Sequence, residues 1–156
     1  MEELRLVEVE DVYVRLLPKE LASVVAENQE FFPEFKLKIG NVILKLSKVR
    51  LAGRVESVED RGRIVDVVLS DGEGRARVRA WDDAARGLLA LKTGILVEVF
   101  GVLRTFRGEL YVAYRFLRRI DEERLQEYVK MLERDRSTFA AMGRRGTTAS
   151  NLPDQK

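Results

Sequence analysis

The residues with the clearest chemistry lie in one short segment, RARVRAW at positions 75–81. Side chains alternate between the two faces of a strand, so a strand here places Ala76, Val78 and Ala80 on one face. The opposite face carries Arg75, Arg77, Arg79 and Trp81, the only tryptophan of the chain. Guanidinium groups suit phosphates, and a flat indole offers a surface for an unstacked base. The segment predicts a contact with single-stranded nucleic acid; the plainer alternative is a solvated arginine row with Trp81 packed under a following helix.

A second basic and aromatic group lies further along the chain. Phe106 stands between Arg104 and Arg107, next to Gly108, at the turn between two further predicted strands. The alternation of the strand before this turn places Arg104 and Phe106 on the face opposite its core residues. We expect both groups to line one groove.

Hydrophobic residues at every second position define the strands that must position these groups. A short helix, capped by Asp82 and Asp83 and ended by Gly94, separates the third strand from the fourth. Three strands, a helix and two strands is the order of the OB-fold barrel, whereas a β-sandwich needs about seven strands. We therefore expect a mainly β protein with a five-stranded OB-fold barrel over residues 46–119. The predicted core positions of the fifth strand are Leu110, Val112, Tyr114 and Phe116.

In an OB-fold the nucleic-acid groove is formed by the second and third strands with the loops that follow the first and fourth strands. Trp81 and Phe106 belong to these parts. The local charge agrees, because residues 46–119 hold 15 Lys and Arg against 10 Asp and Glu, a net charge of +5 that the overall +2 conceals.

The segments that flank the barrel differ from it in composition. Residues 1–45 form an acidic extension of net charge −3, in which Pro18 opens a short predicted helix with Leu21, Val24 and Val25 on its apolar side. At the other end, residues 137–156 lose all periodicity and are expected to be disordered.

Between the barrel and this tail, residues 120–136 predict a C-terminal helix. Its apolar residues form one stripe, consisting of Leu125, Tyr128, Val129 and Leu132. Such a stripe either folds back on its own barrel or packs against helices of partner subunits. We expect the second arrangement, a helix that mediates assembly.

Composition excludes several function classes. The 156 residues include no Cys and no His, so zinc sites, thiol nucleophiles, disulfides and imidazole catalysis are unavailable. The acidic residues are scattered or adjacent, with no cluster typical of a metal site and no pair placed across a pocket. Apolar runs stay short of the roughly 18 residues of a membrane span, and the N-terminus lacks the basic-then-apolar layout of a signal peptide. We expect a soluble intracellular protein that is not an enzyme and needs no metal, cofactor or membrane.

Four segments together resemble the middle (32-kilodalton-class) subunit of replication protein A. They are KIGNV at 38–42, VRAW at 78–81, VEVFGVLRTF at 97–106 and VAYRF at 112–116. The resemblance implies an OB-fold in which Trp81 and Phe106 stack on bases of single-stranded DNA. It also implies a C-terminal helix that joins large and small OB-fold subunits, and a role in DNA replication, recombination and repair. The protein would then be cytoplasmic and nucleoid-associated in an archaeon, or nuclear in a eukaryote.

Two other functions remain open from the sequence. One is an OB-fold assembly or adaptor subunit, of the replication-protein-A-associated or telomere-capping type, that works mainly through protein contacts. The other is an OB module that binds RNA or tRNA. An RNA-binding module would use the same stacking residues, because stacking alone discriminates the sugars poorly.

Overall fold

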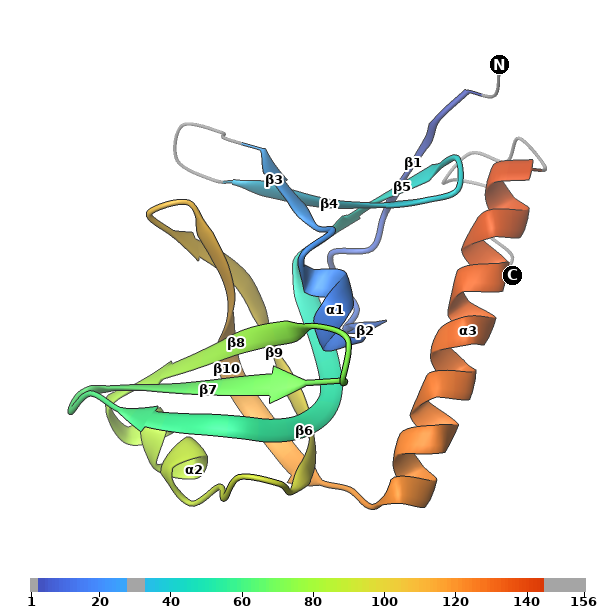
Figure 1. The fold of residues 1–156 in the computed structure, drawn as a ribbon. Coiled ribbons are helices and arrows are strands. Elements are labelled where there is room, and N and C mark those ends of the chain that lie inside the picture. The colour runs from blue at the N-terminus through green and yellow to red at the C-terminus, as the bar shows by residue number, and fades with distance from the viewer. Residues whose placement is uncertain (1–2, 28–32, 145–156) are drawn as a thin grey trace.

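The computed structural model describes residues 3–27 and 33–144, and its main feature is a closed ring of five strands (Figure 1). Strand β6 pairs with β7, β7 with β8, β8 with β10, β10 with β9, and β9 returns to β6. The β8–β10 pairing is parallel and the other four are antiparallel. This ring confirms the expected mainly β OB-fold. The strands are β6 (Lys48–Asp60), β7 (Ile64–Ser70), β8 (Arg75–Trp81), β9 (Leu96–Phe106) and β10 (Glu109–Arg119).

The interior of the ring is filled by the residues that alternation assigns to it. Along β8, Ala76, Val78 and Ala80 are buried, and the intervening residues point outward. Gly101 in β9 has a specific cause: a Cβ there would lie 2.4 Å from the Ala113 carbonyl oxygen of β10. Between β8 and β9 the chain forms a 3-10 turn (Asp82–Ala84) and the helix α2 (Ala85–Leu89).

The N-terminal segment builds a second, smaller sheet above the barrel (Figure 1). Its order is β1 (Arg5–Glu8), β5 (Val42–Leu46), β4 (Glu34–Ile39) and β3 (Val25–Glu27). Strand β2 (Val14–Leu16) instead pairs in parallel with β6. Because β5 spans the predicted boundary at residue 45 and only Ser47 separates it from β6, the extension and the barrel are joined by continuous strand structure.

The helix expected in this extension is shorter than predicted. Helix α1 covers only Pro18–Leu21, and Val25 lies in β3 with 59% of its surface exposed. The apolar pattern at 21, 24 and 25 was misleading because β3 pairs with β4, so backbone pairing replaces the helix after one turn. Val24 still reaches the core.

The core pattern of β10 is also broken at one point. A register shift between Tyr114 and Phe116 inserts one extra residue relative to β9. Such a bulge reverses the facing of every later side chain. Phe116, predicted to be a core residue, therefore lies outside the barrel with 50% of its surface exposed.

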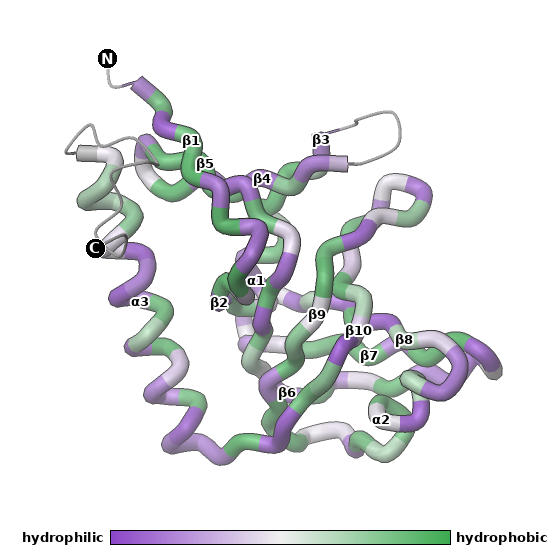
Figure 2. Tube along the Cα trace, turned by 180° about the vertical axis from the view of Figure 1, so that it is seen from behind, coloured by the Kyte–Doolittle hydropathy of each residue, from purple (hydrophilic) through white to green (hydrophobic). Residues whose placement is uncertain are grey.

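The C-terminal helix α3 (Glu122–Arg144) runs alongside the barrel and the small sheet (Figure 1). Its apolar stripe is used within the same chain: Tyr128 and Leu132 are buried against Ala52 of β6, with Leu125 packed beside them. Hydrophilic and hydrophobic residues alternate along α3 (Figure 2), and the residues that are exposed between Glu122 and Thr138 are all polar or charged. The expectation that the whole stripe faces partner helices is therefore wrong for Tyr128 and Leu132. No helix among the described residues is long and apolar enough to cross a membrane.

Helix α3 also continues eight residues beyond the predicted end at 136. Phe139 and Met142 pack against the main core, and the Asn41 side chain donates a hydrogen bond to the Gly143 carbonyl at 3.1 Å. The stripe seemed to stop because Asp135 and Arg136 interrupt it, but both face the N-terminal segment. Asp135 pairs with Arg15 and Arg136 with Glu20, each at 3.0 Å. The rest of the predicted tail, 145–156, lies outside the described residues.

A tyrosine hydroxyl anchors α3 to the barrel, and its removal gives a first prediction. The Tyr128 hydroxyl lies 2.8 Å from the Leu16 carbonyl and 2.7 Å from the Arg50 carbonyl. Burial raises the pKa of Tyr128, so the hydroxyl keeps its proton and donates. Tyr128→Phe should lower the free energy of unfolding by about 1–2 kcal/mol, because it removes the buried hydroxyl that donates to these carbonyls. Urea denaturation measures the change.

The matched control is Tyr13→Phe, which removes a hydroxyl for which no hydrogen bond within the described chain is found. This substitution should leave the urea concentration at the midpoint of unfolding unchanged. Equal stability of the Tyr128→Phe variant and the parent protein would show that the hydroxyl does not hold the helix.

Candidate nucleic-acid interface

The predicted arginine row lies on the outer face of β8, as alternation requires. Arg75, Arg77, Arg79 and Trp81 all point away from the barrel interior. The indole of Trp81 is 40% exposed at the end of the strand. The arginines differ in how open they are: Arg75 is mostly exposed, whereas only 13% of the Arg79 side chain is accessible.

A buried carboxylate on the neighbouring strand organises this row. Asp66 of β7 is 2% exposed and accepts two hydrogen bonds from Arg79, from Nε at 2.7 Å and from Nη2 at 2.9 Å. Arg77 donates a third at 3.2 Å, and Arg61 lies 3.7 Å away. Burial alone would raise the pKa of Asp66, but the hydrogen bond and charge of Arg79, aided by Arg77 and Arg61, outweigh it and hold the pKa below its usual value. Asp66 therefore stays ionised and fixes the arginines.

These pairings limit which arginines are free for phosphates. Arg79 is committed to Asp66, and Arg75 pairs with Glu56 at 2.9 Å. The exposed pair of Arg75 is worth about 1 kcal/mol or less, so a phosphate can displace Glu56 at little cost. Arg79 is a positioning group in this arrangement, because releasing it would leave a buried carboxylate unpaired.

The ring that joins the two predicted groups is Tyr111 of β10, which the sequence analysis did not single out. Its centroid lies 6.0 Å from that of Trp81, and the Arg79 guanidinium stands 5.4 Å over it. Tyr111 is also the register partner of Arg104 on β9. Tyr111 therefore lies between Trp81 of β8 and Arg104 of β9. The sequence could have indicated Tyr111, because alternation along β10 places it on the face opposite the core residues.

The second predicted group forms the tip of the β9–β10 hairpin, which projects from the barrel on the side opposite α3 (Figure 1). Phe106 is 54% exposed, and the Arg107 guanidinium lies 5.1 Å from its ring centroid. Positive φ angles of 51° at Arg107 and 81° at Gly108 produce the tight turn. Arg104 donates to the Leu103 carbonyl at 3.0 Å. Neither Arg104 nor Arg107 has an acidic partner among the described residues, so both are open to phosphates.

The loop between β6 and β7 adds a cation that sequence reasoning missed. Arg63 is exposed and binds Asp82 at 3.0 Å, directly after Trp81. The hydrogen bond and charge of Arg63 lower the pKa of Asp82. The backbone N–H of Asp82 also donates to the Arg63 carbonyl at 2.8 Å. This loop therefore stands beside the tryptophan, and its OB-fold position could have identified it in advance.

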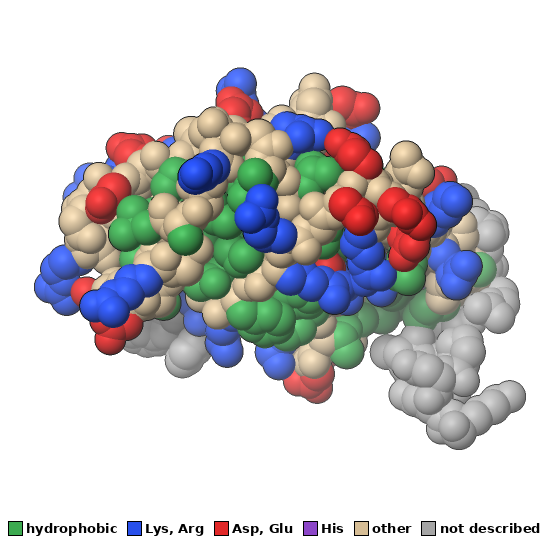
Figure 3. Space-filling view, turned by 90° about the horizontal axis from the view of Figure 1, so that it is seen from below, with side chains coloured by type: hydrophobic (Ala, Val, Ile, Leu, Met, Phe, Trp, Pro, Cys, Tyr) green, Lys and Arg blue, Asp and Glu red, His purple; other side chains and the backbone are tan. Residues whose placement is uncertain are grey.

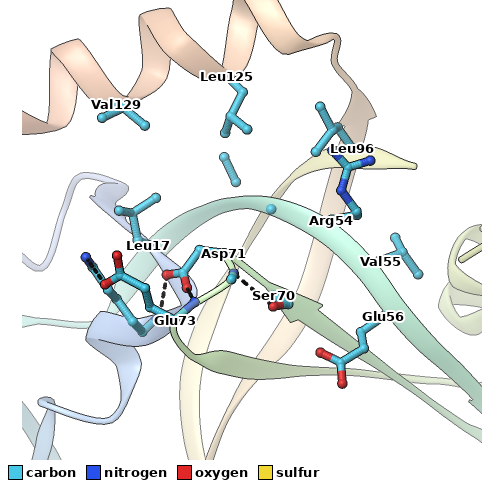
Figure 4. A pocket seen from close by; sticks show the side chains of 14 residues that line it. Leu17, Arg54, Val55, Glu56, Ser70, Asp71, Glu73, Leu96, Leu125 and Val129 are labelled. Carbon is cyan, nitrogen blue, oxygen red and sulfur yellow. Dashed lines mark hydrogen bonds and ion pairs between the residues drawn. The ribbon is translucent and has the colours of Figure 1, made fainter. Parts of the chain in front are cut away.

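The residues predicted to bind partner subunits lie on the other side of the molecule. Tyr128 and Leu132 are buried, but Leu125 and Val129 line an open cavity of about 500 Å³ between α3 and the barrel. Figure 4 shows both side chains directed toward Leu17 and the strands below. Only this part of the stripe remains accessible.

Across residues 3–27 and 33–144, no three His, Cys, Asp or Glu side chains come together in a way that could hold a metal ion.

Comparison with known proteins bears on the barrel and on the whole chain. Residues 49–119 match a family model described as an OB-fold nucleic acid binding domain. An "uncharacterized 18.7 kDa protein in ribosomal RNA operon" of Thermofilum pendens is 31% identical over 135 residues, which cover 83% of this chain and 77% of the relative. The chain belongs to the family of this protein. The barrel therefore matches a nucleic-acid-binding domain of the OB-fold, and this match to a binding domain agrees with the expectation of a non-enzymatic protein.

Two solved structures share the fold of this chain. The Stn1–Ten1 complex of S. pombe aligns with a TM-score of 0.64 at 14% identity, covering 83% of this chain and 96% of that one. A replication protein A heterotrimer bound to ssDNA aligns with a TM-score of 0.61 at 19% identity, covering 77% and 94%. Both alignments extend beyond the barrel alone. At these identities the likeness is one of fold.

Proposed function

We propose that this protein binds single-stranded nucleic acid across the outer face of β8, β10 and β9. The observation that carries the proposal is the row of rings, Trp81, Tyr111 and Phe106, with Arg104 and Arg107 beside it. Bases stack on the two exposed rings, and the free arginines neutralise phosphates. Tyr111, which is largely buried, supports Trp81 from beneath.

The preferred ligand is single-stranded DNA, bound by one subunit of a larger assembly of the replication protein A type that acts in replication, recombination and repair. The fold shared with a heterotrimer bound to ssDNA supports this choice. Two exposed rings supply about 2–6 kcal/mol gross, so this chain alone should bind only at micromolar concentrations or above. Partner OB-fold subunits on the same strand would raise the affinity through effective concentration.

RNA is the second candidate ligand, and one observation favours it. The family relative in Thermofilum pendens is a protein in a ribosomal RNA operon. In either case the rings and arginines have the same roles.

The test uses Trp81 as its own reporter, because it is the only tryptophan of the chain. Titration with an unlabelled single-stranded oligonucleotide should quench its emission, and the signal should saturate at micromolar concentrations. Each phosphate contact should contribute about −0.7 to the slope of log affinity against log salt. Oligonucleotides of one sequence in DNA and RNA form decide between the two ligands.

Duplex DNA of the same sequence serves as the control and should quench less, because its bases are already stacked. If single strands bind, as measured by anisotropy of a labelled oligonucleotide, but leave the emission of Trp81 unchanged, the strand lies elsewhere on the protein.

A further inference from the structure

A second exposed aromatic group lies on the outside of the same hairpin, away from its tip. Phe116 of β10 stacks on Phe100 of β9, with ring centroids 4.4 Å apart and planes inclined by 15°. Tyr13 meets both rings edge-on, at 5.3 Å from Phe100 and 6.0 Å from Phe116. The Arg50 guanidinium lies 4.8 Å from the Phe100 centroid. We call Tyr13, Phe100 and Phe116 the lower aromatic cluster.

Core packing does not account for the position of Phe116. The ring belongs to neither buried cluster, and half of its surface is exposed although Phe100 covers one side. The β-bulge turns it outward: an unbulged strand would have directed it into the barrel. The cluster thus holds an aromatic ring rigidly in water, which is the requirement for stacking on a base.

The surroundings of the cluster are strongly basic. Arg50 and Arg118 share the fully buried carboxylate of Glu98, with Arg50 Nε at 2.7 Å and Arg118 Nε at 2.8 Å. That single carboxylate cannot balance the cations nearby. Lys48 lies 5.8 Å from the centroid of Tyr13 and Arg115 directly precedes Phe116, and neither has an acidic partner among the described residues. The face seen from below carries hydrophobic side chains among both basic and acidic ones (Figure 3).

The cluster and the candidate interface lie on one continuous face. Register pairs Arg104 with Tyr111, Val102 with Ala113 and Phe100 with Phe116, all on the outer side of the hairpin. Phe106 and Phe100 are six residues apart on β9, which corresponds to roughly 20 Å of strand. Arg104, with no acidic partner, stands between them.

We propose that the lower aromatic cluster is a second contact for the same single strand, with Phe116 stacking on a base and Lys48 and Arg115 holding the adjacent phosphates. This inference rests on the proposed function and extends it from a groove at the hairpin tip to a track along the length of the hairpin. A track of this length falls within the range of about 4–16 nucleotides that one OB-fold covers.

A nucleic-acid strand suits this surface better than a protein partner. Arginine and aromatic residues are common in both kinds of interface, but a protein interface excludes unpaired charge from its centre. Here Arg115 directly precedes Phe116 and has no counterion among the described residues. A polyanion supplies that counterion along its whole length.

The experiment compares two oligonucleotide lengths with the full chain, by anisotropy of labelled single strands of about 4 and about 12 nucleotides. Phe116→Ala should weaken binding of the long strand by about tenfold and leave the short strand, held at Trp81 and Phe106, unchanged. Leu89→Ala on α2, which removes a side chain of similar exposure (43%), is the matched control and should change neither.

A second variant tests the proposal even if Phe116→Ala fails to fold. Arg115→Gln with Lys48→Gln removes two charges that have no acidic partner among the described residues, and it should reduce the salt slope for the long strand by about 1.4, at about 0.7 for each phosphate contact. The proposal is overturned if both lengths bind the Phe116→Ala variant as they bind the parent. It is also overturned if the substitution changes only the oligomeric state in sedimentation, which would make the cluster a protein interface. Failure of both lengths to bind the parent protein would instead refute the proposed function.

Discussion

Replacing Asp66 with asparagine is expected to lower the free energy of unfolding by about 3 kcal/mol. The substitution preserves shape but removes the charge that balances Arg79, whose side chain is only 13% exposed. Removing one partner of a buried ion pair costs about 3–5 kcal/mol, because the remaining charge stays desolvated. The lower end applies here, since Arg77 and Arg61 are partly exposed and recover some hydration. Urea denaturation at neutral pH measures the change.

The same carboxylate makes stability depend on pH. The pKa of Asp66 is lower in the folded protein than its usual value of 3.8, so the unfolded chain takes up its proton first as the pH falls. The stabilisation is therefore complete above the unfolded-state pKa and is lost as the pH drops through the folded-state value. The difference between the parent protein and Asp66→Asn should be largest at neutral pH and should shrink below about pH 4.

The control for this prediction is Asp83→Asn. Asp83 is fully exposed, and among the described residues its one ion pair is with Arg86, at 3.9 Å. Its replacement should change the free energy of unfolding by less than about 0.5 kcal/mol. If Asp66→Asn behaves like Asp83→Asn, the buried carboxylate does not hold the arginine row.

The barrel was predictable because each strand buries one face, so hydrophobic residues occur at every second position of the sequence. On β8, the small residues Ala76, Val78 and Ala80 marked the inner face, and this assigned Trp81 and its arginines to the outside. The order of strands and helix was enough to predict the OB-fold.

The partners of these residues were not predictable because they depend on register between strands. Asp66 meets Arg79 through the β7–β8 pairing, and Tyr111 reaches Trp81 through the parallel β8–β10 pairing, which joins segments far apart in sequence. The bulge before Phe116 adds one residue without any change in composition. A prediction from alternation alone assigns the residues after such a bulge to the wrong face of the strand.

Helix α3 shows a different limit. A stripe of apolar residues indicates that a helix is covered on one side, but it does not identify the covering surface. In this chain the barrel and the small sheet cover it, with Tyr128 at one end and Met142 at the other. Ion pairs of Asp135 and Arg136 replace apolar contacts in the middle, which ended the pattern early.

The largest effect on binding is expected from replacing both exposed rings of the interface. Trp81→Ala combined with Phe106→Ala should weaken binding of single-stranded nucleic acid by at least about 30-fold. This is the lower limit for losing two stacked bases at about 1–3 kcal/mol each. Anisotropy of a labelled oligonucleotide measures the loss, since the double variant has no tryptophan. Leu89→Ala, which shortens an equally exposed side chain on α2, should bind as the parent does.

The two single variants decide whether the rings act on separate bases. Trp81 contacts Tyr111, whereas Phe106 contacts Arg107 at the hairpin tip, and no ring contact joins Trp81 to Phe106 among the described residues. Independent contacts should therefore give losses that add in free energy to within about 0.5 kcal/mol. A double variant no weaker than either single variant would mean that one base bridges both rings. If the double variant binds a strand of about 4 nucleotides as well as Leu89→Ala does, that strand does not lie on Trp81 and Phe106.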